Sequence, residues 1–176
     1  MPLRRLRKKG GALSHEDEFA FRKYEIASNI DQGLEGLEIQ RARVLRASQD
    51  ITQNPEASYS VAPNHDADFY LVLLRRMYRV LENTAKENSR VANLKGQYKD
   101  LYPKIKMRDH SEHMGILDIP PIREGSPIIV KLVIVINENR VTIVSGDQEW
   151  NLDTDHGRFV ELMRKFLALW LSTDEE

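Results

Sequence analysis

Six residues near the middle of the chain, RDHSEH at positions 108–113, carry side chains that could do chemistry. An arginine can hold a phosphate or carboxylate through two parallel hydrogen bonds, and a histidine can take up and release protons near neutral pH. The simpler interpretation is a charged helix end. Arg108 would then pair with Glu112 one turn further on, and His110 and His113 would complement the negative C-terminus of the helix.

Several other kinds of site are excluded by the residues present. The chain contains no cysteine, which rules out disulfides, cysteine nucleophiles and thiolate metal sites. It has neither a glycine-rich phosphate loop nor the Gly-x-Ser-x-Gly turn of many hydrolases. His110 and His113 could share a metal ion from one helical face, but no further ligand lies at a spacing that completes a tetrahedral site. We therefore predict no metal and no cofactor.

The elements that position this run begin with a long helix. Ser14 and Asp17 have the spacing of a capping box, and the helix is expected to end near Asp50. Gly33 and Gly36 weaken its middle and predict a kink or close packing against a neighbour. Its apolar residues recur at helical steps and are Phe19, Ile26, Ile30, Leu34, Leu37, Val44 and Leu45.

Two further helical stretches lead into the polar run. The first is predicted to be capped by Asn64 or Asp66 and to end at a turn in 83–89. Its apolar residues are Phe69, Val72, Leu73, Met77, Val80 and Leu81, and those of the next stretch are Val91, Leu94, Tyr98, Leu101, Tyr102 and Ile105. Pro103 is expected to kink or split the last stretch. Its apolar face becomes polar where Arg108 begins the run.

The remainder of the chain has a different character. A proline-rich linker is followed by short β-branched segments with tight turns between them, which predict three strands. Asp153 or Thr154 can cap a final helix with apolar residues Phe159, Leu162, Met163, Phe166, Leu167 and Trp170. We expect Trp150 and Trp170 at the surface where strands and helix pack. Three histidines near helix starts are predicted to be surface residues: His15, His65 and His156.

These patterns predict an α+β fold that is mainly α: a bundle of three to four helices, then a small three-stranded antiparallel β-meander and a C-terminal helix. The predicted organisation is a basic flexible tail over 1–13, the helical bundle over 14–115 and a Pro-rich linker over 116–127. The meander and the last helix follow over 128–172 and pack on the bundle.

Two groups of basic residues could contact a phosphate backbone, although such groups are more often solvated surface. They are Arg4, Arg5, Arg7, Lys8 and Lys9 in the tail, and Arg75, Arg76 and Arg79 on the second helix. The longest strongly apolar run, Ile128–Ile136, is too short for a membrane-spanning helix, and the basic start is not followed by the apolar segment of a signal peptide. We therefore expect a cytoplasmic protein without membrane contact.

Arg108 and His113, with four residues between them and Asp109 in the polar position after the arginine, resemble the R-x(4–6)-H motif of the HEPN superfamily. The resemblance covers roughly residues 14–115 and implies a small helical bundle, usually dimeric, that binds or cleaves RNA. The β-rich segment after Gly115 is not part of the common helical core of that superfamily.

The chemistry implied by the resemblance is RNA cleavage without a metal ion. His113 would transfer protons as acid or base, and Arg108 would stabilise the negative charge of the transition state, with Asp109 or Glu112 orienting either residue. Residues five apart on a helix point about 140° from each other, so a second copy across a two-fold axis would help to complete the site. We thus expect a homodimer. The alternative function is a non-catalytic interaction or scaffold module, or an accessory subunit that binds a protein partner.

Overall fold

The structure, a computed structural model, describes residues 14–53, 62–107, 133–137, 140–145 and 147–172. Its helices are α1 (His15–Gln53), α2 (Ala62–Ala85), α3 (Ser89–Gln97), α4 (Leu101–Ile105) and α6 (Thr154–Leu171). Its strands are β1 (Val133–Asn137), β2 (Arg140–Ser145) and β3 (Gln148–Asn151), which form one antiparallel sheet in the order β1-β2-β3. The predicted fold class is confirmed: several helices, then a three-stranded meander and a C-terminal helix.

The long helix α1 begins as its sequence predicts. The backbone N–H of Asp17 donates to the Ser14 hydroxyl oxygen at 3.1 Å, and that hydroxyl donates to the Asp17 carboxylate at 2.8 Å. The helix runs on past Asp50 to Gln53 without interruption, for 39 residues. Gly33 serves close packing, since a Cβ there would lie 2.8 Å from the Cγ and Sδ atoms of Met77 on α2.

The start of α2 differs from the prediction. The helix begins at Ala62, so neither Asn64 nor Asp66 is its cap. Pro63 lies in the first turn, where backbone N–H groups make no hydrogen bond within the helix, so the N–H that proline lacks is not needed there. The buried face of α2 also differs from the predicted apolar face, because Phe69, which was predicted to belong to that face, is 59% exposed. The residues that α2 buries are Ala67, Tyr70, Leu71, Leu74, Met77, Tyr78, Leu81 and Thr84.

The third predicted helix is split, as expected from Pro103, although the break precedes the proline. The chain leaves helical geometry at Tyr98–Asp100, and Pro103 then lies in the first turn of α4. Asn88 caps α3, with its side-chain oxygen accepting from the backbone N–H of Val91 at 3.1 Å. Met107, just after α4, is fully buried.

The sheet and α6 pack on the helices through alternate residues. Val141, Ile143 and Ser145 of β2 are buried, and Ile143 pairs with Trp150 of β3. Trp150 lies at the predicted strand–helix surface. Trp170 does not: its ring contacts Phe19 of α1, with ring centroids 6.1 Å apart, at the opposite end of α6 from the sheet.

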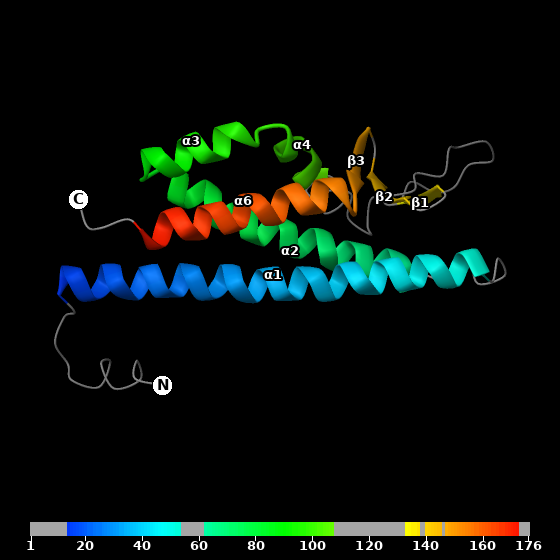
Figure 1. The fold of residues 1–176 in the computed structure, drawn as a ribbon, viewed down its shortest axis with the longest axis horizontal. Coiled ribbons are helices and arrows are strands. Elements are labelled where there is room, and N and C mark those ends of the chain that lie inside the picture. Colours follow the sequence, from blue (N-terminus) through cyan, green and yellow to red (C-terminus); the bar gives the residue numbers. More distant parts are fainter. Residues whose placement is uncertain (1–13, 54–61, 108–132, 138–139, 146, 173–176) are drawn as a thin grey trace, which may run out of the picture.

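Figure 1 shows the arrangement of these elements. The helix α1 runs along one long side, α2 and α6 lie next to it, and α3 and α4 lie beyond them on the other side. The sheet stands near the N-terminus of α6. One hydrophobic cluster includes residues from the helices, from β2 and from β3, so the bundle and the meander share a core. Of the helices in the described part of the chain, none is long and apolar enough to cross a membrane.

Candidate functional site

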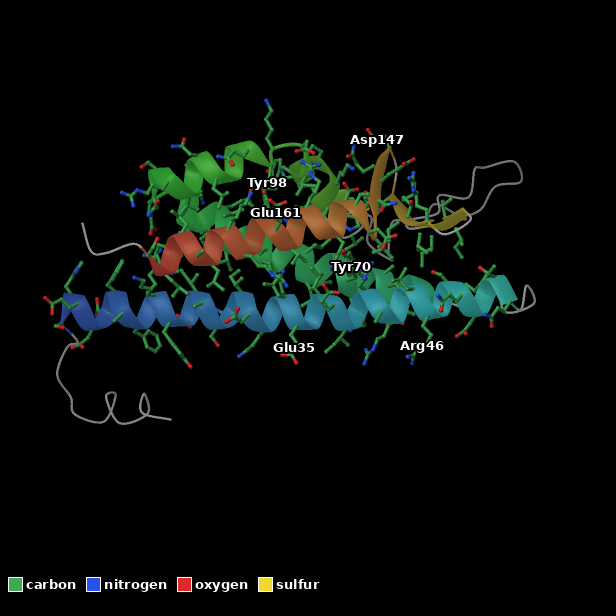
Figure 2. All side chains as sticks on the ribbon, viewed as in Figure 1. Glu35, Arg46, Tyr70, Tyr98, Asp147 and Glu161 are labelled. Carbon is green, nitrogen blue, oxygen red and sulfur yellow. The ribbon has the colours of Figure 1, made fainter. Side chains whose placement is uncertain are left out.

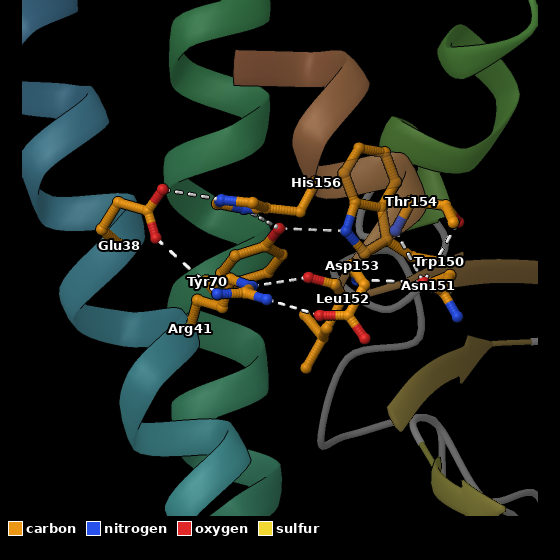
Figure 3. Close-up of polar contacts among 9 residues, drawn as sticks. All are labelled: Glu38, Arg41, Tyr70, Trp150, Asn151, Leu152, Asp153, Thr154 and His156. Atoms are coloured by element: carbon orange, nitrogen blue, oxygen red, sulfur yellow. Dashed lines mark hydrogen bonds and ion pairs between the residues drawn. The ribbon is translucent and has the colours of Figure 1, made fainter. Parts of the chain in front are cut away.

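A chain of buried hydrogen bonds joins four elements at the centre of the molecule (Figure 3). The indole Nε1–H of Trp150 on β3 donates to the hydroxyl oxygen of Tyr70 on α2 at 3.0 Å. The same oxygen lies 3.0 Å from Nδ1 of His156 on α6, and Nε2 of that histidine lies 2.9 Å from the Glu38 carboxylate on α1.

The donors and acceptors fit only one direction along this chain. An indole N–H can only donate, so the Tyr70 hydroxyl accepts from Trp150 and is free to donate its own proton to Nδ1 of His156. The imidazole proton is then on Nε2 and is donated to the Glu38 carboxylate. Each group is satisfied when His156 is neutral and carries its proton on Nε2.

Burial favours the neutral forms of both central groups. It raises the pKa of Tyr70 far above its usual value, because the phenolate would be desolvated. It also lowers the pKa of His156, and this effect outweighs the hydrogen bond that His156 donates to Glu38, which acts in the opposite direction. At neutral pH the chain of hydrogen bonds therefore contains an uncharged tyrosine and an uncharged histidine.

Glutamate, histidine and tyrosine are hydrogen-bonded in the same order as in a catalytic proton relay. The low solvent exposure of the histidine and the tyrosine, however, fits a structural role. Tyr70 is fully buried, and His156 is 5% exposed. Only Glu38 reaches solvent, with 54% of its side chain exposed. A substrate could not reach the tyrosine oxygen without opening the core, so this network ties α1, α2, β3 and α6 together.

A second set of contacts extends the network to the turn between β3 and α6. Arg41, one turn after Glu38, donates from Nε to the backbone oxygen of Leu152 at 2.6 Å and pairs with the Asp153 carboxylate. Asp153 occupies the N-cap position of α6, but its side chain makes no capping bond. The cap is supplied by Asn151, whose side-chain oxygen accepts from the backbone N–H groups of Asp153 and Thr154 at 2.9 and 2.8 Å.

The end of α4 is attached at the same corner. Lys104 donates to both oxygens of the buried Asp155 carboxylate at 2.9 and 2.8 Å, and Asp155 also accepts from the backbone N–H of Asn151 at 2.9 Å. One buried carboxylate thus links α4, β3 and α6. The segment that leads into Arg108 is held on one side by this ion pair and on the other by the buried Met107.

A cleft of about 380 Å³ lies between the C-terminal half of α1 and the sheet. Its described lining residues are Leu45, Ser48, Gln49, Thr52, Gln53, Ile136, Val141 and Asp153. The hydroxyls of Ser48 and Thr52 donate to backbone oxygens one turn earlier, at 2.8 and 2.9 Å, so both present only lone pairs. Asp153 is paired with Arg41. Three of its polar side chains, Ser48, Thr52 and Asp153, are thus engaged within the protein.

The residues predicted from the sequence to act on RNA fall mostly outside the described residues. This is true of the candidate catalytic residues Arg108, Asp109, Glu112 and His113, and of the basic residues Arg4, Arg5, Arg7, Lys8 and Lys9. The three arginines of α2 are described. Arg76 and Arg79 are exposed, whereas Arg75 is half-buried and donates to Glu82 at 2.8 Å.

His156 was wrongly predicted to be a surface residue. Its position near the start of α6 suggested exposure, but the turn that begins α6 is packed against α1 and α2, and the side chain is buried there. Glu38 and His156 are far apart in the sequence, and no local pattern connects them. The sequence offered only an indirect sign that His156 is buried: this histidine, like its neighbour Asp155, lies on a helix face that is otherwise apolar.

No group of three or more His, Cys, Asp or Glu side chains that could hold a metal ion occurs among the described residues. Comparison of the chain with protein-family models, curated protein sequences and solved structures found no match.

Proposed function

We propose that this protein acts on single-stranded RNA, with Arg108 and His113 as the reacting pair in a metal-independent cleavage. The observation that carries the proposal is the anchoring of the chain where the motif begins. Met107 is fully buried, and Lys104 is bonded to the buried Asp155. A catalytic arginine must be held in place to stabilise a transition state, and Arg108 directly follows this anchor.

The surface around the anchor is suited to a polyanion. Lys106 lies just before the motif in the sequence, and its ammonium lies 4.5 Å from the centre of the Tyr102 ring. Single-stranded RNA is commonly held by positive side chains next to aromatic rings on which bases stack. Arg76 and Arg79 add exposed positive charge on α2. The basic tail, with Arg4 among its residues, would strengthen such binding.

The decisive test is cleavage of end-labelled single-stranded RNA in EDTA by the wild type and by Arg108→Ala, His113→Ala and His110→Ala. His110→Ala is the matched control, because this histidine lies in the same run but outside the Arg–His pair. We expect wild type and His110→Ala to leave cyclic-phosphate ends, and the other two variants to be slower by about 100-fold or more. Equal cleavage by all four proteins, or by none, would contradict the catalytic proposal.

Binding can be separated from cleavage in the same set of proteins. If the protein binds RNA without cutting it, affinity should fall steeply with salt and should survive His113→Ala. That outcome would show that the protein binds RNA and would exclude the proposed nuclease activity.

One observation favours the alternative function, an interaction module. The outward face of α1 carries exposed apolar side chains, namely Phe21, Tyr24 and Ile39. Such a surface could bind a partner whether or not the protein acts on RNA.

A further inference from the structure

The helix α1 presents a continuous stripe of side chains that no other described element covers. Figure 1 shows α1 on one long side of the molecule with α2 and α6 on its inner side. The stripe follows steps of three and four residues, which keep to one face of a helix. Its residues are Phe21, Tyr24, Ser28, Gln32, Glu35, Ile39, Ala42 and Arg46, and we name it the outer face of α1.

Three large apolar residues in this stripe are well exposed. Phe21, Tyr24 and Ile39 have exposures of 39%, 61% and 49%. Single exposed apolar residues are common, but three along one helical face form a surface that gains free energy when a partner covers it.

Charge is distributed unevenly along the same side of the helix. Glu25 lies in the N-terminal half, Glu35 lies at the middle, and Arg43 and Arg46 lie in the C-terminal half. All four are exposed, and none makes an ion pair with another described residue. Figure 2 shows Glu35 and Arg46 pointing away from the body of the molecule.

We propose that the outer face of α1 is a homodimer interface, on which the α1 helix of a second copy packs antiparallel about a two-fold axis near residues 33–34. In such an interface residue i contacts residue j of the partner, and j contacts i. About this centre Phe21 lies opposite Arg46, Tyr24 opposite Arg43 and Ser28 opposite Ile39. The Phe21 ring would thus meet the Arg46 guanidinium, a favourable pairing, and Arg43 would lie at the level of Tyr24 on the edge of the interface.

The antiparallel direction also places Glu25 near arginines, whereas Glu35 lies near its own copy at the axis. Glu25 lies opposite Ala42 and therefore beside Arg43 and Arg46 of the partner helix. A parallel arrangement would put each arginine next to its own copy. The stripe from Phe21 to Arg46 is about 39 Å long at ~1.5 Å per residue, which is long enough for an extended helix-pair interface.

This dimer differs from the one implied by the Arg108–His113 motif. The anchor of that motif, α4, lies on the opposite side of α2 and α6 from α1 (Figure 1). An interface at α1 therefore leaves both α4 helices away from the contact between the two copies, and the two dimers can be distinguished by cross-linking.

The first experiment measures the dimer dissociation constant of the full chain by sedimentation. The Arg43→Glu/Arg46→Glu variant should raise this constant by about tenfold or more, because it places like charges together. Adding Glu25→Arg to that variant should restore much of the affinity. All the changed residues are exposed, and circular dichroism checks that each variant is folded. A monomer at every concentration, or a dimer indifferent to the charge reversal, would overturn the proposal.

The second experiment uses the absence of native cysteine. Gln32→Cys places one thiol near the two-fold axis, and Lys106→Cys is the matched control beside the motif. With a short bismaleimide reagent we expect covalent dimers of the first variant and not of the second. Cross-linking of Lys106→Cys alone would show that the copies meet at the motif and would exclude the α1 interface.

Discussion

Among single residues, Tyr70 and Tyr78 show how the partners of a buried hydroxyl differ within one helix. They lie about two turns apart on α2, and both are fully buried. The Tyr70 hydroxyl has Trp150 and His156 as partners, whereas the Tyr78 hydroxyl has no hydrogen-bond partner among the residues that the structure describes. Burial raises the pKa of Tyr78 to about 12, so this group stays neutral as well. Two tyrosines of the same helix therefore contribute differently to stability, because only one of them has hydrogen-bond partners among its described neighbours.

Replacing each tyrosine by phenylalanine tests this difference. Tyr70→Phe leaves the indole N–H of Trp150 and Nδ1 of His156 without partners in the core, and should lower the free energy of unfolding by about 1–3 kcal/mol. Tyr78→Phe removes an unsatisfied hydroxyl and should be neutral or stabilising. Urea denaturation of both variants provides the measurement, and equal losses for the two would refute the assigned roles.

His156 should make the stability depend on pH. Because burial lowers its pKa in the folded state, the unfolded chain takes up a proton at a higher pH than the folded chain does. The free energy of unfolding should therefore fall as the pH decreases below ~6.5, until the folded histidine is itself protonated. Above that pH, His156 should contribute no pH dependence.

Urea denaturation at about pH 7.5 and about pH 5.5 checks this expectation. The loss of stability on acidification should be smaller in His156→Gln than in the wild type. His65→Gln is the control, since His65 is exposed on α2. This variant should lose as much stability on acidification as the wild type does. A His156→Gln variant with an unchanged pH dependence would show that another group is responsible.

At the scale of elements, the contact between α1 and α2 depends on one glycine more than on the other. A Cβ at Gly33 would lie 2.8 Å from Met77, closer than packed atoms allow, whereas a Cβ at Gly36 would lie 3.4 Å from Leu73, an ordinary contact. Met77 is almost fully buried and has little room to move. The sequence predicted that the two glycines would allow either a kink or close packing, and Gly33 provides the close packing.

Alanine substitutions separate the two positions. Both gain helix propensity, worth up to about 1 kcal/mol each. Gly36→Ala should keep that gain, whereas Gly33→Ala should be the less stable variant by about 1–3 kcal/mol because Met77 must be displaced. Thermal or urea unfolding of the two variants measures the difference. If Gly33→Ala proved as stable as Gly36→Ala, the α1–α2 contact would be looser than described.

At the scale of the whole molecule, α1 connects its separate features. Its inner face supplies Glu38 and Arg41 to the buried network and to the turn before α6. Its C-terminal half borders the cleft, and its outer face is the proposed dimer surface. The helix α4, which precedes the proposed RNA motif in the sequence, lies on the far side of α2 and α6.

Much of the fold was determined locally by the sequence. The capping pair Ser14 and Asp17, the helical spacing of apolar residues and the β-branched strands each specify an element through interactions within a few residues. The fold class and the split near Pro103 were therefore predictable. The phase of the α2 stripe was not, because Tyr70 and Tyr78 are amphipathic and only their neighbours decide whether they are buried.

The tertiary structure alone decided the polar core. Glu38, Tyr70, Trp150 and His156 come from four elements, and no spacing along the chain brings them together. A buried hydrogen bond is possible only where the packing of the elements places a donor within about 3 Å of an acceptor and excludes water. The sequence determined which residues could form helices and strands. How those elements packed determined that His156 became a neutral, buried link in the core.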